Sequence, residues 1–186
     1  ALPGIGHIQL SSTGIFMAHV GTGQLRWQWG KRTEFAIGRD RHFMGDGYRS
    51  MILSDNAGPL PYLRVSTSLG PFRYTNMWLR LRDTSNGRTW DQPNIKYAAM
   101  HALSWNVHRR WTLALSEWVI WQERDGSTRR LPDLYYLNPL IFFRPVEYSI
   151  GSPDNVILGF SVRHQATKKC SLYGQFVLDE FNIRQL

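Results

Sequence analysis

Alternation of apolar and polar residues with a period of two limits most strongly how this 186-residue chain can fold. Residues that alternate in this way lie on opposite faces of a β-strand, whereas an amphipathic helix repeats every 3.6 residues. The alternating segments end at turn signals such as TSNG at 84–87 and RDGS at 124–127. We therefore predict an all-β fold of about eight to ten antiparallel strands joined by hairpins, in one unit over 1–186. The apolar residues of the pattern are Leu25, Trp27, Trp29, Leu63, Val65, Met77, Leu79, Leu81, Ile95, Tyr97, Ala99, Leu103, Trp105, Val156, Leu158, Phe160, Val162, Leu172, Phe176 and Leu178.

Two β architectures accommodate such strands. A soluble sandwich or lipocalin-like barrel turns its apolar face inward, whereas an outer-membrane barrel turns that face to lipid and lines its lumen with polar and small residues. Charged residues make up only 19% of the chain and aromatic residues 13%. Trp and Tyr near segment ends, such as Tyr97, Trp105 and Trp121, are typical of the aromatic girdles of a membrane barrel. These features favour the membrane barrel, and the soluble β-protein remains the alternative.

The distribution of charge and the spacing of potential metal ligands exclude several classes of function. The net charge is +8, but the arginines are scattered singly and in pairs, without a basic tail or helix, so we expect no nucleic-acid partner. The six histidines lack the spacing of a zinc site, so we expect no metal. Cys170 is the only cysteine, which excludes an intrachain disulfide, and we expect it to be inert.

Several long sequence blocks are similar to one known family. They are GDGYRSMILSDNAGPLPYLRV at 45–65, YTNMWLRL at 74–81, LSEWVIW at 115–121, YLNPLIFFRPVEYSIGSPDNVILGF at 136–160 and LYGQFVLDEF at 172–181. With these blocks the chain resembles the capsule-assembly Wzi family, and within it the RemB-like gliding-motility proteins of Bacteroidetes. The resemblance covers most of the chain, from about Leu25 to Phe181.

The resemblance implies a non-enzymatic protein of the bacterial outer membrane. Members of this family are β-barrels with more strands than this chain can supply. The chain would therefore be an internal part of a larger barrel, in contact with the lipid bilayer and with missing barrel strands or other outer-membrane chains. The implied role is binding and assembly of capsular polysaccharide at the cell surface, or surface gliding motility, without a cofactor. The alternative is a transport barrel in which arginines on the polar face give an anion-preferring pore.

Charged residues between the apolar strands of 137–160 predict a polar network in the barrel interior. Charges facing lipid are costly, and Pro139 and Pro145 lack the N–H of an interior ladder position, so this segment is expected to turn inward. A solvated turn is the alternative for Asp154. Glu117 and Glu147, with Asp154 or Asp179 as alternatives, also suit glycoside hydrolysis, but spacing does not place them across a sugar, and we assign no catalytic residue. The predicted network comprises Glu117, Arg144, Glu147, Asp154, Asp179 and Glu180.

Aromatic and arginine side chains are the candidates for contact with an acidic surface polysaccharide. Aromatic rings stack on the C–H faces of sugars, and arginine pairs with uronate carboxylates through two hydrogen bonds. Packing in a core or a girdle is the alternative for each ring. The sequence GRDRHFMGDGYR at 38–49 suits a long loop at the barrel mouth or folded into the barrel. The candidate residues are Tyr48, Arg49, Trp90, Trp118, Tyr135 and Tyr148.

Overall fold

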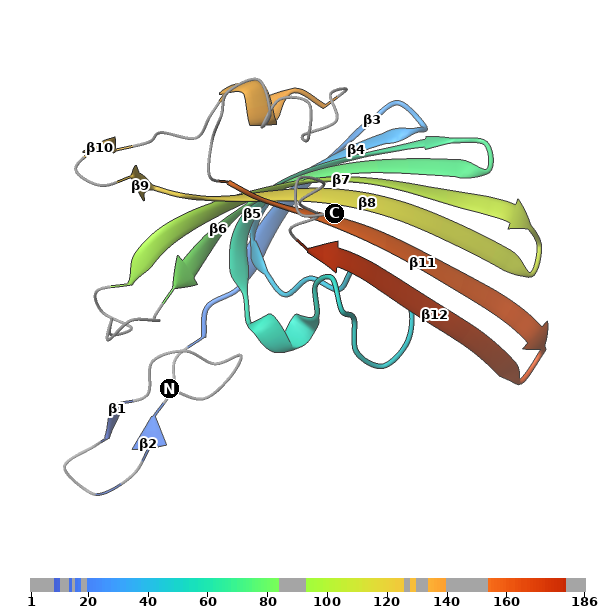
Figure 1. Ribbon diagram of the computed structural model, residues 1–186, viewed down its shortest axis with the longest axis horizontal. Coiled ribbons are helices and arrows are strands. Elements are labelled where there is room, and N and C mark those ends of the chain that lie inside the picture. The colour runs from blue at the N-terminus through green and yellow to red at the C-terminus, as the bar shows by residue number, and fades with distance from the viewer. Residues whose placement is uncertain are drawn as a thin grey trace, which may run out of the picture.

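The computed structural model describes residues 9–10, 14, 16–17, 20–83, 93–125, 128–129, 134–139 and 154–179, and over these residues the fold is all-β (Figure 1). Eight strands form one antiparallel sheet in the order β12-β11-β8-β7-β6-β5-β4-β3. The sheet is not closed, because β3 and β12 are its two ends. The strands are β3 (Gly23–Trp29), β4 (Thr33–Asp40), β5 (Leu60–Leu69), β6 (Phe72–Asp83), β7 (Asn94–His108), β8 (Trp111–Gln122), β11 (Asn155–Thr167) and β12 (Cys170–Asp179).

The remaining regular elements are short. β1 (Gln9–Leu10) pairs with β2 (Phe16–Met17), and β9 (Arg124–Asp125) pairs with β10 (Thr128–Arg129). Two 3-10 helices, η1 (Asp55–Ala57) and η2 (Leu134–Leu137), are the only helices in the described part of the chain. None of the helices found there is long and apolar enough to cross a membrane.

The predicted antiparallel hairpins are confirmed. Period-two alternation predicts strands around 95–105, 111–121, 156–164 and 171–180, and the structure has β7, β8, β11 and β12 there. The stretch around His108, which could also be forced into a helix, is the tight turn between β7 and β8. The alternation on both sides of this turn predicts strands, and β7 and β8 each pair with both of their neighbours in the sheet. This pairing outweighs the weak helical pattern of the sequence.

The connections at the two ends of the sheet differ in length. The turns β3–β4 (30–32), β5–β6 (70–71), β7–β8 (109–110) and β11–β12 (168–169) are short and lie at the right-hand end of the sheet in Figure 1. Gly30 and Gly70 have φ of 61° and 58°, a left-handed conformation that glycine adopts without strain. The connections β4–β5, β6–β7 and β8–β11 are long. We call the first set the short-turn end.

The strand register divides the side chains between two faces. Met77, Met100, Trp118 and Ile157 are partners across β6, β7, β8 and β11 and lie on one face. We call this the loop-covered face, because the β4–β5 connection packs on it. Its core is nearly closed to solvent, and a buried Met or Leu side chain typically contributes about 1.5–3 kcal/mol. The core residues are Ala36, Tyr62, Met77, Leu79, Ala98, Met100, Ala102 and Trp118.

The opposite face, which we call the apolar face, carries most of the predicted apolar set. Leu103, Leu115, Phe160 and Phe176 are register partners on it, across β7, β8, β11 and β12. A second core lies toward the long-connection end of this face and consists of Ala99, Val119, Trp121, Tyr136 and Val156.

Strand β6 departs from the predicted pattern. Met77, Leu79 and Leu81 were assigned to the apolar set, but their register places them on the loop-covered face. Tyr74 and Trp78 lie on the apolar face of this strand instead. The β4–β5 connection provides apolar partners on the loop-covered face, so that face accepts methionine and leucine here.

Candidate functional site

The β4–β5 connection, residues 41–59, crosses the loop-covered face. Met44, Ile52 and Leu53 from this connection pack against the core of that face. An isolated bridge between Met44 and Leu53 and the 3-10 helix η1 give the connection its shape. In Figure 1 it lies below the sheet, between the β4–β5 edge and β12. The predicted loop at 38–49 begins three residues later than expected, because residues 38–40 still belong to β4.

Polar contacts fasten this connection to the far edge of the sheet. The Met51 N–H donates to Gln175 Oε1 at 2.9 Å, and Gln175 Nε2 donates to Ser50 Oγ at 3.4 Å. Arg163 Nε lies 3.6 Å from an oxygen of Asp46. The connection that starts at β4 therefore contacts β11 and β12, which are separated from β4 by four and five strands in the sheet order.

Gly47 shows how closely the connection approaches β12. Its φ is 98°, which disfavours any side chain, and a Cβ built there would lie 2.2 Å from the ring of Tyr173. Gly47, the second glycine of GDGYR, therefore satisfies two requirements at once, a left-handed backbone and contact with an aromatic ring.

Ionisable side chains sit where the connection leaves β4. His42 is buried and its ring meets Tyr62 edge-on, with centroids 4.2 Å apart. Burial lowers the pKa of His42, the positive charge of Arg64 lowers it further, and Asp40 opposes this shift. The imidazole is therefore neutral at pH 7 and packs as an uncharged ring. Arg64 is held by an ion pair of 2.9 Å with Glu34.

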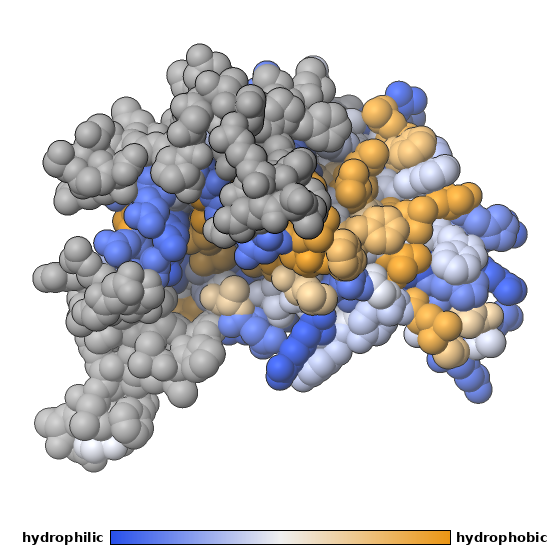
Figure 2. All heavy atoms as spheres, in the orientation of Figure 1, coloured by the Kyte–Doolittle hydropathy of each residue, from blue (hydrophilic) through white to orange (hydrophobic). Residues whose placement is uncertain are grey.

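Large apolar side chains stay exposed on the apolar face, and most of them lie toward the short-turn end. Figure 2 shows orange and paler side chains side by side along the strands, with blue side chains at the right-hand tips. Phe72 stacks on Trp105 at 5.6 Å, and Trp111 stacks on His164 at 4.0 Å. We call this set the exposed belt: Leu25, Trp27, Trp29, Ile37, Leu63, Leu69, Phe72, Leu103, Trp105, Trp111, Leu115, Phe160, Leu172 and Phe176.

Polar side chains interrupt the apolar face at one level. Asn76, His101 and Glu117 are register partners on β6, β7 and β8, and all three are buried. Sequence reasoning included Glu117 in its network but missed Asn76 and His101. On β7 and β8 the signal was present, because His101 and Glu117 interrupt the apolar parity of their own strands, whereas Asn76 lies on the parity of β6 that was predicted to be polar.

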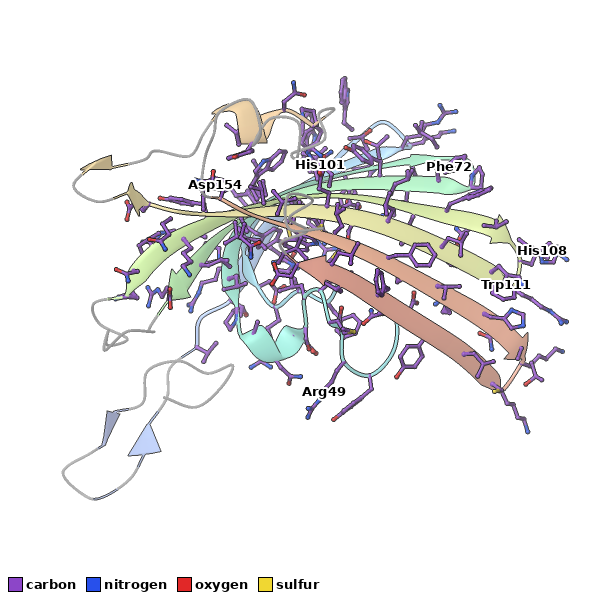
Figure 3. The ribbon with its side chains drawn as sticks, viewed as in Figure 1. Arg49, Phe72, His101, His108, Trp111 and Asp154 are labelled. Atoms are coloured by element: carbon purple, nitrogen blue, oxygen red, sulfur yellow. The ribbon has the colours of Figure 1, made fainter. Side chains whose placement is uncertain are left out.

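Residues 134–139 and Asp154 cover the apolar face near this polar row. Trp78 Nε1 donates to the Tyr136 carbonyl at 2.8 Å, and the Tyr74 hydroxyl donates to the Pro139 carbonyl at 2.6 Å. The Tyr136 hydroxyl donates to Asp154 Oδ2 at 2.9 Å. Figure 3 shows His101 and Asp154 on the upper side of the sheet, where η2 also lies.

The predicted charge network is divided between the two faces. Glu117 is buried on the apolar face, whereas Asp179 is exposed and lies on the opposite face, since its partner Ile157 aligns with Trp118. The two carboxylates therefore do not meet, which differs from the expected shared interior. Asp154 is buried rather than in a solvated turn. Arg144, Glu147 and Glu180 lie outside the described residues.

The candidate saccharide-binding residues also lie in different environments. Tyr48 is 83% exposed, and the guanidinium of Arg49 lies 5.7 Å from its ring centroid. Trp118 is only 5% exposed and belongs to the core of the loop-covered face, so its ring has no surface to offer a sugar. Trp90, Tyr148 and the side chain of Tyr135 are not among the described parts of the chain.

Over the described ranges, no group of three His, Cys, Asp or Glu side chains is arranged to hold a metal ion. Comparison of the chain with protein families, with curated proteins and with solved structures gave no match.

Proposed function

We propose that this chain forms part of an antiparallel β-barrel in the bacterial outer membrane. The observation that carries the proposal is the exposed belt. Soluble monomers rarely expose contiguous apolar patches of more than a few hundred Å². Here Leu103, Leu115, Phe160 and Phe176 form one exposed row across four neighbouring strands. Such a row is stable when lipid covers it.

The lengths of the connections support the same proposal. Outer-membrane barrels have short turns at the periplasmic end and longer loops at the extracellular end. The sheet shows this asymmetry, with short turns after β3, β5, β7 and β11. In this orientation Tyr48 and Arg49 belong to an extracellular connection that folds back into the interior.

The two ends of the sheet require further strands in this proposal. Unpaired N–H and C=O groups of an edge strand are costly in lipid. β3 and β12 are the ends of the strand order. We therefore propose that they pair with further barrel strands or with other outer-membrane chains.

Within such a barrel, we propose a non-enzymatic role in binding and assembling surface polysaccharide or in surface gliding motility, as the resemblance to Wzi- and RemB-like proteins implies. The β4–β5 connection supports it, because a segment that crosses the interior is suited to scaffolding more than to free passage. The transport alternative is favoured by the arginines on the loop-covered face, which are Arg26, Arg64, Arg73 and Arg163.

Arg49→Ala is expected to weaken binding of an alginate-type polyuronate about tenfold or more. Hydrogen bonds to a charged group contribute about 1.5–3 kcal/mol, and about 1.4 kcal/mol corresponds to a factor of ten. The measurement is titration calorimetry on the protein reconstituted in bilayers. Arg49→Lys should retain part of the affinity, because lysine keeps the charge and loses the planar fork.

Arg41→Ala is the matched control, since Arg41 is also an exposed cation of the same connection. Equal binding of alginate and neutral dextran, or equal losses in the two alanine variants, would contradict the assignment of Arg49. Planar-bilayer conductance of the same preparation tests the transport alternative. An anion-selective open pore would favour transport over scaffolding.

A further inference from the structure

Cations are concentrated in the turns of the short-turn end. Three of the four turns carry a pair of exposed cations, and the fourth is followed by exposed Arg73. The turn residues contain no Asp or Glu. The ion pairs found in the described part of the chain, Arg64–Glu34, Lys96–Asp83 and Arg163–Asp46, use none of these turn cations. The six turn cations are Lys31, Arg32, Arg109, Arg110, Lys168 and Lys169.

Aromatic rings of the apolar face lie directly beside these turns. Trp29 ends β3 one residue before its turn, and Trp111 starts β8 immediately after Arg110. Phe72 starts β6 and stacks on Trp105 of β7. Figure 3 shows Phe72, His108 and Trp111 together at this end of the sheet. Cations therefore lie beyond a layer of aromatic rings, which itself adjoins the aliphatic part of the exposed belt.

This order of side chains matches the layers of one bilayer leaflet. Aliphatic side chains suit the acyl chains, Trp and Tyr rings suit the level of the headgroups, and Lys and Arg reach the phosphates. We propose that the short-turn end binds the headgroups of anionic phospholipids in the adjacent leaflet, an inference that rests on the proposed membrane function. The occupant is a lipid phosphate with net negative charge, because the six turn cations, which form no ion pair within the described residues, are charge-complementary to it and zwitterionic headgroups are not.

The expected effect is local enrichment of anionic lipid. A Lys or Arg near an anionic membrane surface contributes about fivefold in affinity. The contribution is screened when ionic strength rises, since the Debye length falls from about 10 Å at 0.1 M to about 3 Å at 1 M. Enrichment at the short-turn end should therefore be strong at low salt and weak at high salt.

Cys170 provides a native probe for this enrichment. It is exposed and lies at the start of β12, next to Lys169. The protein is labelled there with a fluorophore and reconstituted in phosphatidylcholine bilayers. Trace phosphatidylglycerol or phosphatidylcholine carrying a nitroxide near the top of one acyl chain is added, and quenching is compared. We expect severalfold stronger quenching by the phosphatidylglycerol probe.

The variant K31Q/R32Q/R109Q/R110Q, which leaves the label's neighbours intact, is expected to reduce the difference between the two quenching values. R41Q/R80Q is the control, because it removes exposed cations that lie outside the short turns. Equal quenching in the wild type, or an equal loss in the control, would overturn the proposal. If soluble polyphosphate binds this end and the lipid preference is absent, the occupant is a soluble polyanion instead, which also overturns it.

Insertion is measured separately, by heat-dependent gel mobility and protease resistance of the reconstituted protein. Protein that inserts without a lipid preference would refute this inference and leave the barrel proposal intact. Protein that does not insert would refute both.

Discussion

Leu115→Arg is expected to lower the free energy of unfolding in bilayers by about 2–4 kcal/mol, the cost of an arginine at the lipid face of a barrel midplane. Leu115 is 52% exposed and lies in the middle of the exposed row on the apolar face. Urea titration of the reconstituted protein measures the change.

The same substitution separates the membrane barrel from a soluble β-protein. An exposed leucine in water can become arginine at a cost within about 0.5 kcal/mol. Gln28→Arg is the control, because Gln28 is exposed on the loop-covered face. A small, equal effect of both substitutions would contradict the lipid-facing assignment of the apolar face.

Trp118→Ala is expected to destabilise the protein by about 3–5 kcal/mol. The ring of Trp118 is buried with Met77, Met100 and the cover from Ile52. Removing it leaves a cavity between the sheet and the β4–β5 connection. Denaturant unfolding followed by circular dichroism measures the loss.

Tyr48→Ala is the comparison for this second prediction. Tyr48 is exposed, so its loss should change stability by no more than about 0.5 kcal/mol. If Trp118 were a sugar platform, Trp118→Ala would weaken polysaccharide binding and leave the unfolding transition unchanged. That result would contradict the burial of Trp118 described above.

The strands themselves were predictable from the sequence, because each one pairs with neighbours that share its alternation. β7, β8, β11 and β12 lie where period-two segments and turn signals placed them. The face of β6 was not predictable. Met77 and Leu79 lie on one face of this strand, and Tyr74 and Trp78 lie on the other. Both pairs are apolar enough to occupy either face of the sheet. The decision depends on the β4–β5 connection, which is distant in sequence and covers the methionine side.

The candidate site was less predictable than the strands, because it depends on contacts between faces. The prediction of one interior network grouped Glu117 and Asp179 by their charge. It did not establish on which face of its strand each residue lies. Glu117 belongs to the apolar parity of β8, where His101 and Asn76 share its level. Trp118, next to it, then necessarily points to the opposite, covered face. Only Tyr48 and Arg49 of the proposed saccharide residues are described as exposed.

A spin-label scan of β8 tests most directly whether the apolar face contacts lipid. In a Cys170→Ser background, single cysteines are placed at 111–116, labelled with a nitroxide and reconstituted in bilayers. Collision with oxygen, which concentrates in hydrocarbon, is compared with collision with a water-soluble nickel chelate. The proposal predicts a period of two, with high oxygen and low nickel accessibility at 113 and 115 and intermediate values at 111, which lies at the level of the headgroups. High nickel accessibility at 113 and 115 would contradict it.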